Sequence, residues 1–236
     1  MKIIFFSDAH GNRYAIDQFF EDVKTMAYDR IIFGGDIFGY YYEQEYILSV
    51  LKRKNVHCLL GNHDRMFLDL IESRGSESAL VKKYGNSYKD IGMKISKKNI
   101  DFLYSLQSRY EIQIDGLSLC FVHGTVEDPL DGRIYPDTEI EDMSGYEKYD
   151  FVFAGHTHHK MVKKLRCGCT IINAGSIGQQ RDGRGCSYVI FDTINRSWNF
   201  KVCSYSKDKL LRDINENEET VVMRERLGEV LLRRNG

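Results

Sequence analysis

The sequence predicts an α/β protein whose first part is organised on a parallel sheet. Three short apolar runs typical of buried strands alternate with segments of helical periodicity. The strand runs are 2–6, 30–33 and 56–60. Strands that alternate with helices pair in parallel through right-handed crossovers. Such sheets bind ligands at the carboxyl ends of their strands, so the loops after these three runs are candidate site loops.

Apolar side chains recur at helical spacing between the three runs, which predicts two helices that pack on the sheet. They are Ala15, Ile16, Phe19, Phe20, Val23 and Met26 in the first, and Tyr46, Ile47, Val50 and Leu51, within 43–54, in the second.

The rest of the chain divides into three parts. Residues 64–108 predict a small helical insertion, and the part from 109 onward turns to strands at 110–114, 117–122, 151–154, 161–165, 170–172, 188–191 and 198–202. The charge-rich tail predicts one or two helices packed on the outside, with a partner-binding or oligomerisation helix as the alternative. We therefore predict a domain over 1–205, with the insertion at 64–108, and a helical extension over 206–236.

Composition narrows the function classes. The 236 residues carry 33 basic and 34 acidic side chains, and the net charge of −1 argues against a large nonspecific nucleic-acid footprint. No apolar run approaches the ~20 residues of a membrane span, and the apolar N-terminal stretch is too short for a signal peptide. We expect a cytoplasmic protein with a small-molecule partner and no membrane partner.

The six cysteines lack paired CxxC spacing, so a disulfide scaffold is not expected. Cys167 and Cys169 flank Gly168, and we interpret them as part of a turn, with chelation or a strained disulfide as the alternative.

Polar side chains follow each apolar run, and five of the seven histidines stand at such strand ends. Any one of them is more simply a hydrogen-bonded loop residue or a turn. Together they would crowd carboxylate, imidazole and amide groups at one edge of a sheet, and a pair of divalent cations resolves that crowding. Mixed oxygen and nitrogen ligands favour Mn²⁺, Fe or Zn²⁺ over Ca²⁺ or Mg²⁺. The predicted ligands are Asp8, His10, Asp36, Asn62, His123, His156 and His158.

The motifs that hold these residues resemble the calcineurin-like metallophosphoesterase superfamily over about residues 1–205. They are Asp8-x-His10, Gly35-Asp36, Gly61-Asn62-His63-Asp64, His123-Gly124 and Gly155-His156-Thr157-His158. Segments 35–40 and 173–183 are similar to those of its small bacterial and archaeal phosphodiesterase group, although Ala174 replaces the proline usual after Asn173.

The resemblance implies a four-layer αββα sandwich of two mixed β-sheets, with helices on both outer sides. It also implies a ligand assignment: Asp8, His10 and His158 for the first metal, Asn62, His123 and His156 for the second, and Asp36 as the bridge. His63 would protonate the leaving oxygen, and Asp64 would orient His63, with a helix N-cap as the alternative for Asp64.

The implied activity is that of a dinuclear-metal phosphohydrolase, in which activated hydroxide attacks a small-molecule or nucleotide phosphoester. A phosphodiester is favoured over a phosphomonoester, and Mn²⁺ over Fe, Zn²⁺ or Ni²⁺. The alternative is a non-catalytic metal-binding scaffold on the same fold. A nucleotide-binding switch is disfavoured because the chain has no GxxxxGK loop.

Three residues are candidates for substrate binding, each with a structural alternative. Asn12 would donate to a phosphate oxygen or cap a helix, Tyr40 would stack on a ring or pack in the core, and Arg181 would pair with a phosphate or with a carboxylate. A homo-oligomer is possible.

Overall fold

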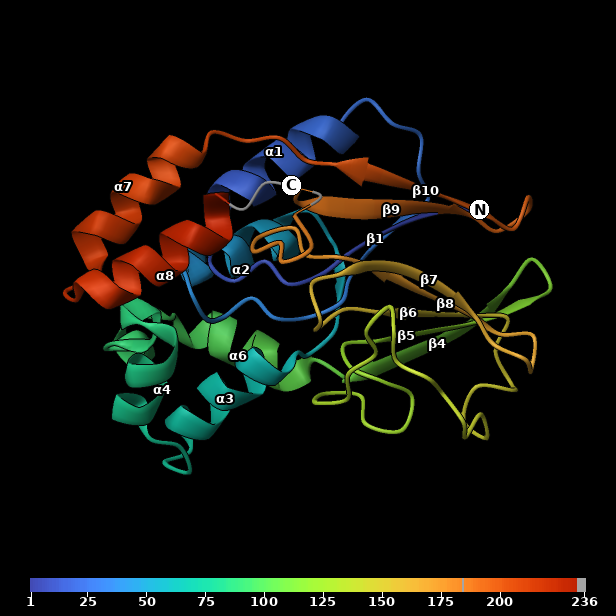
Figure 1. Ribbon diagram of the computed structural model, residues 1–236, viewed down its shortest axis with the longest axis horizontal. Coiled ribbons are helices and arrows are strands. Elements are labelled where there is room, and N and C mark those ends of the chain that lie inside the picture. Colours follow the sequence, from blue (N-terminus) through green and yellow to red (C-terminus); the bar gives the residue numbers. More distant parts are fainter. Residues whose placement is uncertain (184, 233–236) are drawn as a thin grey trace.

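The computed structural model describes residues 1–183 and 185–232, so residues 184 and 233–236, the latter part of the predicted extension, lie outside the described residues. Two five-stranded sheets pack face to face, with the helices gathered at one side and one end (Figure 1). The predicted pair of mixed sheets is confirmed. Among the described residues, no helix has both the length and the apolar character needed to cross a membrane.

The first sheet has the strand order β10-β9-β1-β2-β3. As predicted, its first three strands, β1 (Lys2–Phe6), β2 (Arg30–Phe33) and β3 (His57–Cys58), are parallel. Strands β9 (Ser187–Asp192) and β10 (Ser197–Val202) add an antiparallel hairpin beside β1. Strand β3 is shorter than its apolar run: the Leu59 N–H still donates to the Phe33 carbonyl, but Leu59 also forms an isolated bridge with Gln107, and the Leu60 N–H donates to the Gln107 carbonyl.

The second sheet has the order β4-β5-β6-β8-β7. Its strands are β4 (Arg109–Ile114), β5 (Leu117–Val122), β6 (Phe151–Ala154), β7 (Lys160–Lys164) and β8 (Thr170–Ala174). The pairs β5–β6 and β6–β8 are parallel. Their carboxyl ends therefore share one edge of this sheet, as those of β1 and β2 do in the first.

Successive side chains of β1 point to opposite faces of the first sheet and so contribute to two layers of the core. Phe5 points between the sheets, where its ring lies 5.6 Å from that of Phe153. Phe6 points outward and lies 4.1 Å from Phe19 of α1 (Arg13–Val23). Because successive strand residues face opposite sides, one apolar strand fills two layers of core.

Helix α1 and α2 (Gln44–Arg53) cover the outer face of the first sheet. The outer face of the second sheet differs from the expectation of helices on both sides. Residues 123–150, all of which the structure describes, form no helix and cover this face as an irregular segment. Val126, Ile134 and Tyr146 of this segment supply the apolar surface that a helix would otherwise bury there.

The predicted insertion is helical, and its elements surround one end of the first sheet. They are α3 (Asn62–Ile71), α4 (Glu77–Tyr84), the short η1 (Asn86–Tyr88), α5 (Ile91–Lys94) and α6 (Lys97–Ser105). The tail forms α7 (Lys207–Asn217) and α8 (Val221–Leu232). Their buried Leu210, Ile214, Leu227 and Leu231 belong to the hydrophobic core that α1, α2 and the insertion form on the outer face of the first sheet. Figure 1 shows α8 lying above α4.

A buried carboxylate between α7 and α8 fastens this hairpin to the insertion. Glu218 is only 4% exposed, and its Oε1 accepts hydrogen bonds from the Tyr42 hydroxyl at 2.9 Å and the Asn86 N–H at 2.8 Å. A residue after the end of a helix is seldom buried with a charge unless it is paired in this way.

The substitution Glu218→Ala should leave two half-buried donors without their partner and lower the free energy of unfolding by about 1–3 kcal/mol. Urea denaturation of the purified chain measures this. The matched control is Glu219→Ala, which removes an exposed carboxylate that pairs with Lys89 and should leave the midpoint almost unchanged. Equal losses in the two variants would contradict a fastening role for Glu218.

Candidate metal centre

All seven predicted ligands are brought together, buried, at the facing edges of the two sheets. Asp8 and His10 follow β1, Asp36 follows β2, and Asn62 begins α3. From the second sheet, His123 follows β5, and His156 and His158 follow β6. The carboxyl ends of parallel strands therefore meet where the sequence predicted them to meet.

Five of these residues have a backbone conformation that side chains other than glycine rarely adopt. The φ angles are 61° for Asp8, 48° for His10, 66° for Asp36, 65° for His156 and 61° for His158. Left-handed residues of this kind concentrate at functional sites, where the surrounding structure holds them in place. The strand-end loops are thus shaped to aim side chains at one point.

The first cluster places lone pair against lone pair. His10 Nδ1 lies 2.6 Å from the Phe38 carbonyl, and His158 Nδ1 lies 2.5 Å from the Gln179 carbonyl. A carbonyl only accepts, so both Nδ1 atoms carry the ring protons. The Nε2 atoms of His10 and His158 then face each other 3.0 Å apart without a proton between them. Asp8 Oδ1 lies 3.3 Å from His158 Nε2. A cation between them fits this arrangement.

The second cluster gathers around His123. Its Nδ1 donates to the Gly34 carbonyl at 2.9 Å, and its Nε2 lies 3.0 Å from Asn62 Oδ1 and 3.1 Å from His156 Nδ1. His156 Nε2 is buried without a hydrogen-bond partner among the described residues. Asn62 Oδ1, His123 Nε2 and His156 Nδ1 thus converge, which again fits a cation.

Asp36 lies between the clusters. Its Oδ2 is 3.7 Å from His10 Nε2 of the first cluster and 3.3 Å from His123 Nε2 of the second. Its Oδ1 accepts the N–H of His63 at 2.8 Å, which fixes the carboxylate orientation. Asp36 is thus the carboxylate that both clusters share.

The electrostatics of the site require positive charge. Burial alone would raise the pKa of Asp36, but His123 and His63 outweigh it and hold that pKa well below its ordinary value. Burial would lower the pKa of His123, but Asp36 raises it to about 9. Burial and the neighbouring His123 lower the pKa of His156 to about 3, so this imidazole is neutral and its lone pair is available.

His63 sits beside the ligands and is positioned by a residue that the sequence did not indicate. Its Nδ1 lies 2.9 Å from the Tyr88 hydroxyl, which donates to the His63 carbonyl at 3.2 Å. Tyr88 must therefore accept the Nδ1 proton, and the ring presents Nε2 to the pocket that His63 lines.

The Asp64 carboxylate is bound by backbone N–H groups. It accepts the N–H groups of Gly61 at 2.9 Å, Asp36 at 2.9 Å, Ile37 at 2.7 Å and Phe38 at 3.2 Å. It thus secures the start of α3 and the loop that carries Asp36. This supports the helix-start alternative, because the carboxylate is engaged by the backbone while the His63 ring is held by Tyr88.

We expect Tyr88→Phe to lower kcat about 10-fold, in the range found for residues that orient a catalytic histidine, with KM nearly unchanged. The variant removes only the hydroxyl that fixes the ring. Tyr84→Phe is the control, because the Tyr84 ring also lies against His63, 4.5 Å between centroids, but its hydroxyl makes no hydrogen bond to the ring within the described residues. A similar loss in both variants would reject a positioning role for Tyr88.

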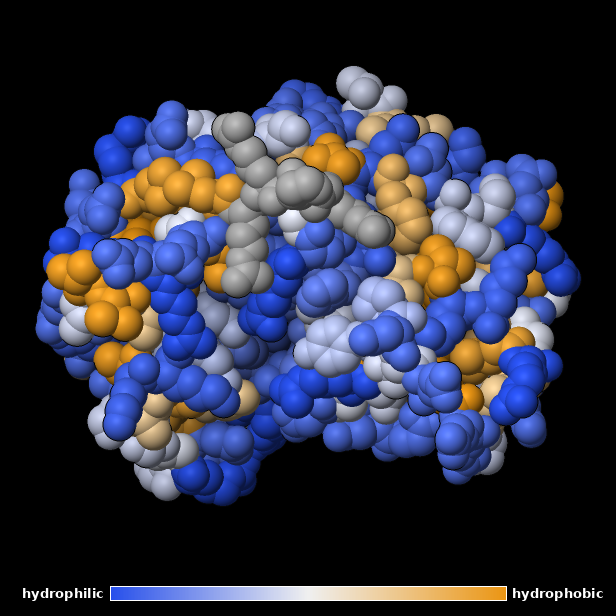
Figure 2. Space-filling view, viewed as in Figure 1, coloured by the Kyte–Doolittle hydropathy of each residue, from blue (hydrophilic) through white to orange (hydrophobic). Residues whose placement is uncertain are grey.

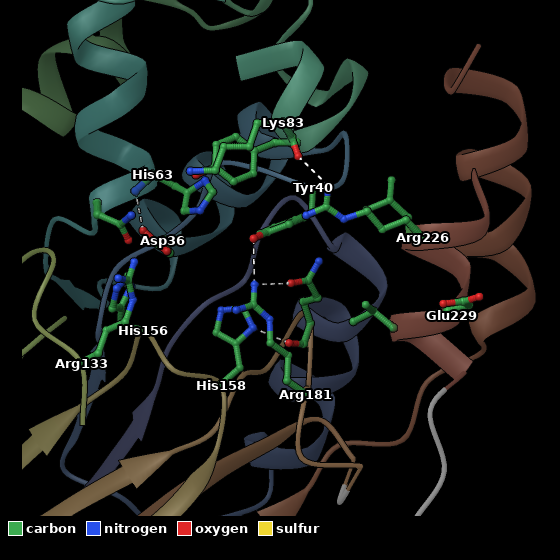
Figure 3. Close-up of a pocket in the computed structure, with 15 residues that line it drawn as sticks. Asp36, Tyr40, His63, Lys83, Arg133, His156, His158, Arg181, Arg226 and Glu229 are labelled. Atoms are coloured by element: carbon green, nitrogen blue, oxygen red, sulfur yellow. Dashed lines mark hydrogen bonds between the residues drawn. The ribbon is translucent and has the colours of Figure 1, made fainter. Parts of the chain in front are cut away.

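A pocket of about 400 Å³ opens over the centre. Figure 2 shows this face hollowed near its middle, between the helical and the strand-rich halves, with a mainly hydrophilic rim. In Figure 3, Asp36, His63 and His156 stand at one end of the pocket, and Tyr40 and Arg181 stand nearer the middle. The Arg181 guanidinium donates to the Tyr40 hydroxyl at 2.8 Å and to Gln179 Oε1 at 3.1 Å.

The remaining substrate candidate is used elsewhere. Asn12 accepts the N–H of Ala15 at 3.1 Å, which caps α1, and donates to the Gly178 carbonyl and the Tyr205 hydroxyl, both at 2.8 Å. It is fully buried and does not line the pocket. The helix-cap alternative therefore accounts for Asn12, since its polar atoms are satisfied inside the protein.

Four charged residues of the pocket lining were missed at the sequence level: Lys83, Arg133, Arg226 and Glu229. They come from α4, the 123–150 segment and α8, which are distant in sequence from the strand-end motifs. Only the fold places them over the centre. His159 directly follows the ligand His158, but its Nδ1 contacts the Thr157 carbonyl at 2.6 Å.

The two sheets and the paired clusters of buried histidine and aspartate define a metallophosphoesterase type of protein. Residues 1–196 match the family model of the calcineurin-like phosphoesterase superfamily domain, and the chain belongs to this family. It is 30% identical over 207 residues to the uncharacterized protein MJ0912 of Methanocaldococcus jannaschii, covering 79% of this chain and 80% of that protein.

Solved structures share the fold. A metallophosphoesterase from Sphaerobacter thermophilus has a TM-score of 0.77 at 24% identity, covering 98% of this chain and all 100% of that one. The hypothetical protein PH1004 from Pyrococcus horikoshii has a TM-score of 0.78 at 18% identity, covering 96% of this chain and 97% of that one. Both alignments extend over nearly the whole chain, so the similarity to these proteins is not confined to the sheets.

Proposed function

We propose that the protein hydrolyses small-molecule phosphoesters with two divalent cations held by the seven buried ligands. One observation carries this proposal: Asp36 lies between two clusters of converging ligand atoms at the end of a pocket that His63 also lines. Asp8, His10 and His158 would hold the first cation, and Asn62, His123 and His156 the second. Two cations supply Lewis acidity toward the phosphoryl group and a hydroxide near neutral pH.

The chain itself supplies the remaining parts of the reaction. His63, held through Nδ1 by Tyr88, presents Nε2 to the pocket, and its doubly protonated form would deliver the Nε2 proton to the leaving oxygen. Arg181 is suited to bind a non-bridging phosphate oxygen, because its guanidinium is supported by Tyr40 and Gln179 rather than by a carboxylate. Burial of the ligands excludes bulk water from the reacting centre.

Mn²⁺ is the proposed cation, because two carboxylates, four imidazoles and one amide form a mixed ligand set. A phosphodiester is the proposed ester, because the pocket of about 400 Å³ extends well beyond the ligands and leaves room for a group on each side of the phosphate.

Hydrolysis of bis-p-nitrophenyl phosphate and p-nitrophenyl phosphate tests this proposal. Chelation should abolish release of p-nitrophenolate, Mn²⁺ should restore it, and the diester should be preferred. Asp8→Asn serves as a control for adventitious activity, since it removes a ligand and should abolish the recovery. If neither ester is hydrolysed while the cations are bound, the proposal fails and a metal-binding scaffold becomes the better description.

A further inference from the structure

The wall of the pocket formed by the insertion and the C-terminal hairpin is basic. Lys83 lies on α4 and Arg226 on α8, and the Arg226 Nη1 donates to the main-chain carbonyl of Lys83 at 3.1 Å (Figure 3). Both side chains are exposed and line the same pocket as the metal ligands. Two segments distant in sequence thus meet at this wall, and each contributes a cationic residue to the pocket lining.

These cations are not neutralised by a carboxylate pair. Within residues 1–183 and 185–232, neither Lys83 nor Arg226 forms an ion pair, and the Lys83 ammonium lies 4.9 Å from the centre of the Tyr84 ring. Arg226 has five N–H donors, and its bond to Lys83 uses one. Arg133 and Arg181 also line the pocket, whereas Glu229 is the one carboxylate in the lining besides the metal ligand Asp36.

This concentration of charge is local, because the whole chain has a net charge of −1. Cations gathered around a cleft raise the local concentration of an anionic ligand and bind it by charge-assisted hydrogen bonds. A surface without function on a nearly neutral protein would intersperse carboxylates among them. The wall is therefore suited to an anion.

The α8 side of this wall lies opposite the metal centre. In Figure 3, Asp36 and His156 stand at one end of the pocket, and the Arg226 side chain enters from the opposite side toward Tyr40 and Arg181. A pocket of about 400 Å³ is large enough for a drug-sized ligand, which is more than one phosphate with a small leaving group needs.

We infer that the natural substrate carries a second phosphate beyond the scissile one, and that Lys83 and Arg226 bind it. The inference rests on the proposed function, which places the scissile phosphate at the metal centre. The substrate class is a phosphoester with a terminal phosphate, of which a 5′-phosphorylated dinucleotide is a representative. The C-terminal hairpin is then a specificity element of the site.

The test compares two ligands that differ by one phosphate, the dinucleotides pApA and ApA. Their dissociation constants are measured with the cations bound and with His63→Ala in every chain compared, since that change slows the hydrolysis of these poor leaving groups. The chain with Lys83 and Arg226 intact should bind pApA about 10-fold more tightly than ApA, since one well-placed charge-assisted contact is worth roughly that factor. The double variant Lys83→Ala/Arg226→Ala should bind the two ligands equally, and Arg226→Lys should keep part of the preference.

The control is Lys82→Ala/Arg212→Ala, which changes the net charge equally on α4 and α7 but at residues that do not line the pocket. It should keep the full preference, and the preference of the chain with Lys83 and Arg226 intact should fall with added salt. Equal affinity of that chain for both ligands, no binding of either, or a preference that survives in the double variant would each overturn the inference. Hydrolysis of bis-p-nitrophenyl phosphate is measured separately: a chain that prefers pApA but hydrolyses nothing would retain this site and reject the proposed function.

Discussion

Asp36→Asn is expected to weaken both cation sites at once and to lower kcat/KM by at least about 1,000-fold. The carboxylate lies within 3.7 Å of the first cluster and 3.3 Å of the second, so an amide in its place removes a shared negative charge. The amide would also direct N–H donors at ligands that have lone pairs. Metal analysis of the purified variant should find fewer than one cation per chain at a concentration that saturates wild type.

Asp8→Asn is the matched comparison, because it makes the same chemical change at a ligand of only one cluster. The Asp8 carboxylate lies 3.3 Å from His158, and we expect this variant to keep the second cation and lose the first. A finding of two cations per chain in Asp36→Asn, or of the same loss in both variants, would show that Asp36 does not bridge.

His63→Ala should slow the hydrolysis of esters with poor leaving groups by about 100- to 10,000-fold, the range of general acid catalysis. A poor leaving group needs a proton as its bond to phosphorus breaks, whereas p-nitrophenolate needs little. The same variant should therefore retain most activity on bis-p-nitrophenyl phosphate. The experiment measures kcat on a series of aryl esters for wild type and for His63→Ala. It then compares how steeply kcat depends on the pKa of the leaving phenol in the two proteins.

His57→Ala controls for the loss of an imidazole, since His57 lies on β3, outside the site, with its ring against Tyr110. It should follow wild type on every ester. An unchanged dependence on the leaving group in His63→Ala, with all esters slowed alike, would assign His63 to metal positioning instead of proton transfer.

The main features of the fold and centre could be predicted because they depend on local signals. Apolar runs of strand length ended by Asp8, Asp36 or His123 fix both a strand and the polar group at its end. The carboxyl ends of parallel strands then share an edge wherever the crossovers have the usual hand. Chain order alone was thus enough to gather the predicted ligands.

The parts that the sequence did not indicate depend on contacts between distant segments. Tyr88 reaches His63 across 25 positions of the insertion, and Arg226 reaches Lys83 across 143. No periodicity or motif marks such pairs. For Asp64 the sequence left two roles open, orientation of His63 and a helix N-cap, and the structure adds three N–H donors from the Asp36 loop that no local signal marks.

A titration of Mn²⁺ into the metal-stripped chain, with heat and hydrolysis of bis-p-nitrophenyl phosphate followed together, tests the dinuclear centre most directly. Binding should end at two cations per chain, and activity should reach its plateau only as the second site fills. A plateau of activity at one cation per chain, or full activity in the stripped protein, would contradict a dinuclear centre bridged by Asp36.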